Sequence, residues 1–329
     1  MRASHVLLKD FDVDVIILSL DRASETIAAI ESTLAQQGVQ KNVIVVDQGS
    51  SAPELARITA YVAGKPVRFE ALAENRGVPG GRNYAAGLGR APIIVAIDND
   101  ARFEGPDVLR QTVARMKAEP NLGALGFRIL DGDSDEDDWG SWVYPFERRA
   151  DADKEFEVAS FVGAGHALRR EAFERAGGYD DLLFFMWEEL DLSHRILDLG
   201  YRMVYAPDLV VRHTRADGAR LHWRGARFYY NARNRMYLHA KYGGGFLRTA
   251  KSAVGFLMQG ALNGFLPQAI QAVVDTPGLL RRHRSRSARE QARCDLKAET
   301  RARIAALDGF GGTSIATRLR RDLFRKVEG

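Results

Sequence analysis

Strand-like and helix-like hydrophobic patterns alternate along the first hundred residues. Continuous apolar runs, which predict buried strands, lie at 13–20, 43–46, 67–71 and 92–97. Between them, apolar residues recur at helical spacing, as at Ile27, Ile30 and Leu34. Strands separated by helices favour βαβ units. We therefore predict an α/β fold with a mostly parallel sheet and helices on both faces.

Acidic residues follow these predicted strands where they end. Asp21 follows the first strand, Asp47 the second, and Asp98 with Asp100 the fourth. Right-handed crossovers bring such strand ends to one edge of the sheet, where open α/β sheets bind their ligands. Two carboxylates there can hold Mg²⁺ or Mn²⁺ together with substrate phosphates. The plainer alternative is an acidic turn before the helix predicted at 106–118.

A glycine-rich loop follows the third predicted strand, at residues 74–83. It leads into a helix predicted over 80–89, so free backbone N–H groups and the helix dipole can face a phosphate. Arg76 and Arg82 add positive charge. The glycines lack the G-x-G-x-x-G spacing of a dinucleotide-binding loop, and a plain turn stays the alternative.

An ordered series of motifs across residues 12–215 resembles the family 2 glycosyltransferases, enzymes with the GT-A fold. The motifs are VIVVDQGS (43–50), NRGVPGGRN (75–83), IDNDA (97–101), FVGAG (161–165), GGYD (177–180), FMWEELDLSHR (185–195) and APDLVVRH (206–213). Within the family they are most similar to bacterial rhamnosyltransferases and galactofuranosyltransferases. The resemblance implies a Rossmann-like GT-A catalytic domain over 1–215 and a helical, basic region over 216–329.

The resemblance, together with the glycine-rich loop, gives roles to single positions. The expected nucleotide-sugar site consists of Leu20, Asp21, Asp47, Arg76, Gly77, Arg82 and Asp98, with Asp47 on the nucleotide base. The expected metal ligands are Asp100, Asp98 and His213. An imidazole suits Mn²⁺ better than Mg²⁺, so His213 favours Mn²⁺. A histidine at a strand end that merely lies on the surface is the alternative.

An acidic pair at the start of a helix predicted over 188–199 supplies the candidate base. Inverting transfer needs a carboxylate that takes the proton of the acceptor hydroxyl, and the family places it in such a pair. Here the pair is Glu188 and Glu189, and we favour Glu189, although the family more often has Asp there. Trp187 and Asp191 are candidate acceptor contacts. Alternatively, the acids only stabilise the helix N-terminus and Trp187 is a core residue.

Charge distinguishes the last third of the chain. Residues 281–329 hold 14 Lys/Arg and 6 Asp/Glu, a net of +8, so the other 280 residues carry 4 − 8 = −4. An apolar helical face over 246–266 precedes this basic run and suits an anionic membrane surface. A core helix followed by a solvated charged helix is the alternative. The polyprenyl-linked acceptors common in the family favour the membrane.

Other features of the sequence indicate where the protein acts and what it binds. The single cysteine, Cys294, excludes an internal disulfide, and the N-terminus lacks the apolar core of a signal peptide, so we expect a cytoplasmic enzyme, peripheral on the inner face of the membrane. No aromatic residues interleave with the arginines of residues 281–286, so we expect no binding of nucleic acid. The formation of a homo-oligomer stays an open possibility. A calcium loop that began at residue 131 would need glycine at its sixth position, where Glu136 stands, and glutamate at its twelfth, where Trp142 stands. We therefore interpret residues 131–138 as a solvated acidic loop near the acceptor.

These observations predict an inverting, metal-dependent glycosyltransferase. It would move a sugar from a UDP- or dTDP-sugar to a hydroxyl of a bacterial surface glycan or glycolipid. A sugar-nucleotide pyrophosphorylase is an alternative, but it would need a glycine-rich loop after the first strand, where residues 20–24 contain no glycine. A catalytically silent domain that binds glycan or membrane is the non-enzymatic alternative.

Overall fold

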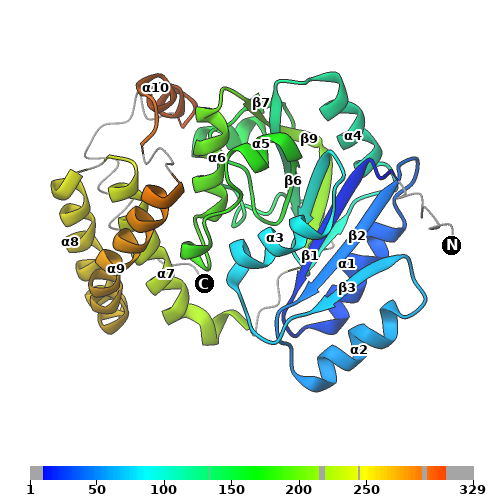
Figure 1. Ribbon diagram of the computed structural model, residues 1–329, viewed down its shortest axis with the longest axis horizontal. Coiled ribbons are helices and arrows are strands. Elements are labelled where there is room, and N and C mark those ends of the chain that lie inside the picture. The colour runs from blue at the N-terminus through cyan, green and yellow to red at the C-terminus, as the bar shows by residue number, and fades with distance from the viewer. Residues whose placement is uncertain (1–9, 133, 215–218, 244, 291–294, 309–329) are drawn as a thin grey trace, which may run out of the picture.

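The computed structural model of the chain describes residues 10–132, 134–214, 219–243, 245–290 and 295–308. A nine-stranded sheet forms the centre of this described part (Figure 1). Its strands are β1 Val13–Ser19, β2 Lys41–Asp47, β3 Val67–Ala71, β4 Ile93–Ile97, β5 Ala101–Phe103, β6 Leu122–Asp131, β7 Phe156–Glu157, β8 Gly165–Arg169 and β9 Arg202–His213. Their order is β3-β2-β1-β4-β8-β6-β9-β5, and β7 pairs with β9.

The first four strands run parallel, as the alternation of strand and helix predicts. Ser19 lies opposite Asp47, and Ile17 lies opposite Ile97, so these strands end at one edge. The strand β8 is inserted antiparallel between β4 and β6. Its first residue, Gly165, pairs with Ile97 and therefore starts at the same edge. The predicted α/β class is confirmed.

Helices cover both faces of the sheet. They are α1 Ala23–Leu34, α2 Ala52–Val62, α3 Gly77–Leu88, α4 Val108–Ala118, α5 Arg170–Arg175, α6 Glu188–Asp198, α7 Ala219–Lys241, α8 Gly245–Asn263, α9 Leu266–Glu290 and α10 Ala298–Leu307, with short 3₁₀ turns η1 Phe146–Asp151 and η2 Asp181–Leu183. Side chains of α1, α2 and α4 pack on one face, and those of α3, α5 and α6 on the other. Because the central strands are apolar on both faces, both need such a cover.

The helices α7, α8 and α9 form a separate layer beside α6 (Figure 1). They share a small core that includes Phe228, Met236 and Phe256. A buried ion network joins α7 to the part of the chain that contains the sheet, since Lys241 Nζ lies 2.7 Å from Asp180 Oδ2 and 2.6 Å from Asp191 Oδ1. Charges taken out of water need such pairing. This network therefore fixes α7 against α6.

The predicted division after residue 215 lies two residues beyond the last residue of β9, His213, and stays a prediction. Residues 215–218 lie outside the described part, as do Cys294 and the end of the basic tail over 309–329. Among the described residues, no helix is long and apolar enough to cross a bilayer.

Candidate active site at the carboxyl edge of the sheet

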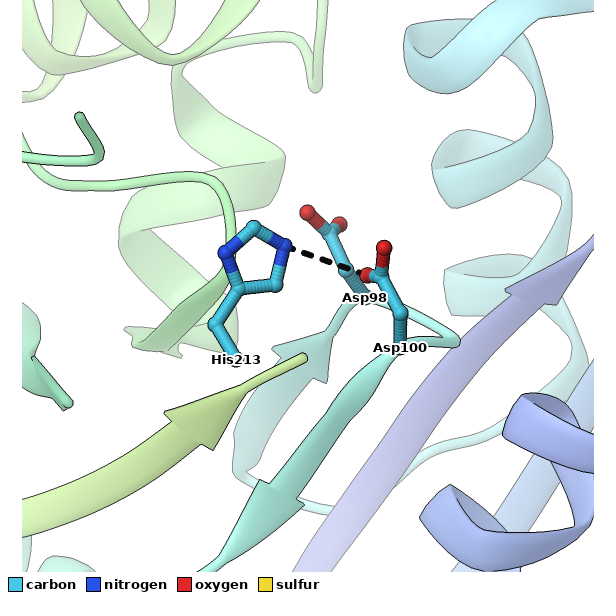
Figure 2. Close-up of side chains that lie close together, drawn as sticks. All are labelled: Asp98, Asp100 and His213. Atoms are coloured by element: carbon cyan, nitrogen blue, oxygen red, sulfur yellow. Dashed lines mark ion pairs between the residues drawn. The ribbon is translucent and has the colours of Figure 1, made fainter. Parts of the chain in front are cut away.

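Three of the predicted metal ligands come together at the edge where the parallel strands end. Figure 2 shows Asp98, Asp100 and His213 pointing toward one another. Asp98 follows β4, and the pairing of β5 with β9 places Ala101, the neighbour of Asp100, opposite His213. One potential ligand atom from each side chain lies within 4.8 Å of those of the other two. Two carboxylates and an imidazole are a donor set that fits Mn²⁺.

The charges around the two aspartates also fit a cation. Burial raises the pKa of Asp98, and the charges of Asp100 and Glu189 raise it further, against the opposing effect of Arg82. Burial would likewise raise the pKa of Asp100, but the hydrogen bond and charge of His213, with the charge of Arg22, lower it. Several negative groups thus crowd one point. A divalent ion bound there would offset their mutual repulsion.

Arg22 is a site residue that sequence reasoning missed. Its Nη1 lies 2.8 Å from Asp100 Oδ2. Its Nη2 is buried and has no hydrogen-bond partner among the described residues. A buried donor without a partner costs free energy, so this nitrogen marks a place where an anionic ligand would be stabilised. Arg22 has positive φ, 58°, and only the folded turn after β1 aims it at Asp100.

Asp138 lies behind His213 and is the second residue that the sequence did not reveal. Its Oδ2 lies 3.0 Å from His213 Nδ1, while His213 Nε2 lies 3.2 Å from Asp100 Oδ1. The carboxylate is buried and also accepts hydrogen bonds from the backbone of Gly140 and from Ser141. A carboxylate on one ring nitrogen orients a metal-binding histidine and raises its basicity.

The expectation of a solvated loop at 131–138 is therefore correct only in part. Residues 134–136 are exposed, but Asp138 is buried. The loop folds back because Asp138 N donates to Ile129 O at 2.8 Å. Asp138 and His213 are 75 positions apart, and no spacing in the chain relates them.

Arg82 joins the metal ligands to the acidic pair. Its side chain is 3% exposed, and its Nη1 lies 2.6 Å from Glu189 Oε1 while its Nη2 lies 3.1 Å from Asp98 Oδ1. Although burial opposes it, the ring of Tyr179 and the charges of Glu189 and Asp98 raise the pKa of Arg82, so the side chain stays cationic. One guanidinium therefore holds two predicted site carboxylates near each other. A Cβ on Gly163 would lie 2.5 Å from Glu189 Oε1, so a side chain there would displace the Glu189 carboxylate from this position.

The two acids at the start of α6 differ in environment. Glu189 faces Arg82 and its side chain is 16% exposed. Glu188 is buried, and its Oε2 has no hydrogen-bond partner among the described residues. Burial, and then the charge of Glu189, raise the pKa of Glu188 well above its ordinary value. This environment favours the neutral form of Glu188, whereas Glu189 is the more exposed acid of the pair.

The loop that leads into this acidic pair is strained. Phe184, Met186 and Trp187 have φ of 61°, 70° and 74°, values that side chains other than glycine rarely adopt. Strained residues persist only where their surroundings hold them. We refer to residues 183–187 as the entry loop.

Side chains of helix α7 hold the entry loop in this conformation through hydrogen bonds. Asn234 is fully buried, and its Nδ2 lies 2.8–2.9 Å from three carbonyl oxygens, those of Leu183, Phe185 and Met186. Arg233 Nη2 donates to Leu183 O at 2.7 Å. The segment 229–234 thus has a structural task at the site that its sequence did not reveal.

The other predicted nucleotide-sugar residues are more dispersed. Leu20 is half-buried, and exposed Asp21 accepts a hydrogen bond from Ser51 N at 2.8 Å. Asp47 is fully buried, and its carboxylate accepts hydrogen bonds from the backbone of Gly49 and Ser50. It therefore organises the loop after β2, and its contact with a nucleotide base stays a prediction.

The glycine-rich loop separates its two arginines. Arg82 lies among the site carboxylates, whereas the guanidinium of Arg76 lies 5.0 Å from the ring centre of Tyr84. Gly77, with φ of 72°, packs against the entry loop, and a Cβ there would collide with the carbonyl oxygen of Phe184. The structure thus explains Gly77 by a close backbone approach, and phosphate binding by this loop stays a prediction.

The predicted acceptor residues lie toward α7. Trp187 Nε1 donates to Asn231 Oδ1 at 2.9 Å, and its ring packs beside Leu183. Asp191 is fully buried, and its carboxylate is ion-paired with Arg195 and Lys241. A carboxylate so enclosed cannot reach an acceptor in this structure. We therefore assign Asp191 to the anchoring of α6 on α7.

Comparison with known proteins identifies a family for the sheet part of the chain. A family model described as "Glycosyl transferase family 2" matches residues 14–177. The succinoglycan biosynthesis protein ExoO of Rhizobium meliloti (strain 1021) is 37% identical over 107 residues, 32% of this chain and 30% of that protein. The N-acetylglucosaminyl-diphospho-decaprenol L-rhamnosyltransferase of Mycobacterium tuberculosis is 31% identical over 75 residues, 23% of this chain and 24% of that protein. The matches therefore span less than a third of these relatives.

A solved structure shares the fold. The mannosyltransferase PcManGT from Pyrobaculum calidifontis, in complex with GDP-Man and Mn²⁺, aligns with a TM-score of 0.57 at 18% identity. The alignment covers 97% of this chain and 89% of that one. At this identity the likeness establishes the fold, and it confirms the predicted GT-A architecture.

Proposed function

Because the chain belongs to glycosyl transferase family 2, we propose that it transfers a sugar from a nucleoside diphosphate sugar to an acceptor hydroxyl with inversion at the anomeric carbon. One observation carries the proposal. Arg82 holds Glu189 and Asp98 on the two ends of one guanidinium, so a candidate base lies beside a candidate metal site. Inversion needs this juxtaposition, because the acceptor must be deprotonated next to the donor's departing diphosphate.

On the donor side, we assign the ion to Asp98, Asp100 and His213, with Mn²⁺ favoured over Mg²⁺. When bound, such an ion neutralises the charge that builds up on the leaving diphosphate. Support comes from the clustering of the three ligand atoms and from the Mn²⁺ in the complex of PcManGT. Arg22, whose Nη2 has no hydrogen-bond partner in the described part of the chain, adds a fixed positive charge next to Asp100. Leu20, Asp21, Asp47, Arg76 and Gly77 complete the proposed nucleotide-sugar site.

On the acceptor side, Glu189 accepts the proton of the attacking hydroxyl. The acceptor oxygen forms the new glycosidic bond as the bond from the anomeric carbon to the phosphate oxygen breaks. The diphosphate leaves with the electron pair of that bond, and the proton goes to the Glu189 carboxylate. Glu188, buried beside Glu189, supports the pair without acting on substrate, and Trp187 stays a candidate acceptor contact.

We propose UDP- or dTDP-sugars as donors and a bacterial surface glycan or glycolipid as acceptor. The relatives support the acceptor class, because one is named for succinoglycan biosynthesis and the other acts on a decaprenol-linked sugar. A lipid-linked acceptor would place the enzyme at the inner face of the cell membrane. Whether it works there as a homo-oligomer is a separate question for solution measurements.

A donor screen tests this function. The full chain is incubated with a panel of nucleotide sugars, with Mn²⁺ or with EDTA, and released nucleoside diphosphate is measured with and without a polyprenyl-linked acceptor. We expect Mn²⁺-dependent release from one class of donor and a product whose anomeric configuration is inverted. Release of nucleoside triphosphate on addition of pyrophosphate would instead identify a pyrophosphorylase. Absence of turnover with every donor would leave only a binding role.

A further inference from the structure

Large apolar side chains lie uncovered on two neighbouring helices, α8 and α9. Eight of them are at least 40% exposed: Phe246, Leu247, Val254, Met258 and Leu262 on α8, and Leu266, Ile270 and Val274 on α9. We call this set the apolar face. Single exposed apolar residues are normal on a protein surface, but a set gathered on two helices marks an interaction site.

The apolar face is separate from the residues that hold these helices in place. Phe256, Gly260, Ala269 and Ala272 are buried, and Phe256, Ala269 and Ala272 belong to the core shared with α7. Val254, Met258 and Leu262 recur every four residues, as do Leu266, Ile270 and Val274, so each trio forms a row along its helix. Folding of the described part therefore does not require these rows to be covered.

The charges around the apolar face select its partner. Residues 245–286 contain six Lys/Arg and a single acidic residue, Asp275, which accepts a hydrogen bond from Tyr229. Lys251 lies on α8 between two residues of the apolar face, four positions after Leu247 and three before Val254. Arg281 and Arg284 follow Val274 at spacings of seven and ten, which continues the row on α9. The apolar rows are thus continued by cations.

Apolar rows bordered by cations match the surface of an anionic bilayer, where acyl chains lie beneath negative headgroups. A second copy of the same face matches poorly, because its cations would meet cations. We propose that the apolar face of α8 and α9 binds the headgroup region of an anionic lipid bilayer, with both helices lying along the surface. The proposal deepens the proposed function, since it would bring a lipid-linked acceptor to the enzyme.

Vesicle sedimentation tests the proposal. The full chain is mixed with vesicles of phosphatidylcholine alone or of phosphatidylcholine with phosphatidylglycerol, at low and at high salt. We expect binding to the anionic vesicles at low salt, weaker binding at high salt, and little binding to the neutral vesicles. The double variant Leu262→Gln/Ile270→Gln should lower the partition coefficient at least tenfold. The exposed Val143, on the loop before η1, provides the control Val143→Gln, which should bind like the wild type.

A second set of matched variants tests the contribution of the cations to vesicle binding. Arg281→Gln/Arg284→Gln should weaken binding by about fivefold per arginine, equivalent to ~1 kcal/mol each. Lys65→Gln/Arg90→Gln removes the same charge from exposed positions on the sheet domain and should leave binding unchanged. Donor hydrolysis should persist in all these variants, so loss of vesicle binding is distinguishable from failure of the proposed function.

Three outcomes would overturn the proposal. The wild type could ignore anionic vesicles at low salt, or Leu262→Gln/Ile270→Gln could bind them as well as the wild type does. Alternatively, light scattering could reveal a wild-type dimer that becomes a monomer in the Leu262→Gln/Ile270→Gln variant. That result would assign the apolar face to contact between two copies of the chain.

Discussion

Two regions of the molecule bring acidic side chains to Arg82, and they hold these acids by different means. Asp98 and Asp100 lie between β4 and β5, where backbone pairing sets their position: Asp98 N donates to Ala164 O at 3.3 Å, and Thr214 N donates to Asp100 O at 2.8 Å. Glu188 and Glu189 instead follow the entry loop, whose left-handed residues depend on Asn234.

This difference predicts how the two parts of the site respond to distant substitutions. Asp98 and Asp100 are positioned without backbone strain, because strand pairing over the core sets the register of the sheet edge on which they lie. Each strained residue of the entry loop costs about 1–3 kcal/mol, and contacts from elsewhere must offset that cost. The acid pair should therefore be sensitive to changes on α7, which the metal-binding acids should tolerate.

We expect the largest effect from a substitution of Glu189, which follows the entry loop. Glu189→Gln keeps the shape of the side chain but cannot take up the acceptor proton, so kcat should fall by about 10³-fold. Donor binding, measured by calorimetry with the nucleoside diphosphate, should stay near normal. Glu188→Gln is the matched control and should retain most activity. The reverse pattern would move the role of base to Glu188, and full activity in both would leave the pair with a structural role only.

On the strand-edge side, Asp100→Ala should lower turnover by about 10²-fold, which corresponds to ~3 kcal/mol of transition-state stabilisation. The affinity for the nucleoside diphosphate should also become insensitive to Mn²⁺. Glu136→Ala removes an exposed acid from the nearby loop and serves as the control. Undiminished activity of the wild type in EDTA would contradict the assignment of a metal.

Asn234→Ala tests the link between α7 and the entry loop. Loss of the amide removes the hydrogen bonds from Asn234 to the carbonyls of Phe185 and Met186, whereas Leu183 O keeps Arg233 as a donor. We therefore expect kcat to fall about tenfold or more and the unfolding free energy to drop by about 1–3 kcal/mol. Mn²⁺ affinity should be unchanged, because the strand edge does not depend on this contact. The control Asn263→Ala, at an exposed position on α8, should change neither kcat nor the unfolding free energy. An equal loss of Mn²⁺ affinity would show that the two regions are not separable.

Asp138→Asn tests whether the strand edge also has a positioning residue. The amide preserves size but removes the charge that orients His213, so Mn²⁺ affinity should fall about tenfold or more. Paramagnetic resonance of free Mn²⁺ measures this without any assay of turnover. Glu136→Gln is the control, and the melting temperature reports whether the fold is intact. Unchanged Mn²⁺ affinity would reduce Asp138 to a loop-holding role.

The smallest expected effect concerns pH and Glu188. Because burial raises its pKa, the folded protein keeps this proton at pH values where the unfolded chain releases it. The stability that results is fully present below the unfolded value of about 4.3 and declines as the pH rises above it. Glu188→Gln cannot ionise, so near neutral pH it should be more stable than the wild type, and this gain should be absent at acidic pH. Denaturant melts at acidic and neutral pH would measure this; an equal difference at both would exclude ionisation as the cause.

Local sequence patterns determined the sheet and the edge on which the site lies. The third strand was predicted at 67–71 and is observed at Val67–Ala71, and the other three early strands agree to within a few residues. A buried strand needs a run of apolar side chains, and the residues just after it lie at the carboxyl edge by topology alone. The place of Asp98 and Asp100 was therefore predictable from the end of β4, whereas His213 was predicted only from the resemblance of residues 206–213 to the family.

Only the tertiary structure decided how these groups are held. Arg82 could be identified as a charge near phosphate, but its place between Glu189 and Asp98 depends on residues 107 and 16 positions away. Asp138 looked like part of a solvated loop until the fold buried it behind His213. Asp191 looked accessible on its helix until Lys241 enclosed it. Each of these roles is a contact between distant positions, and hydrophobic periodicity carries information about burial but none about which distant side chain will be the partner.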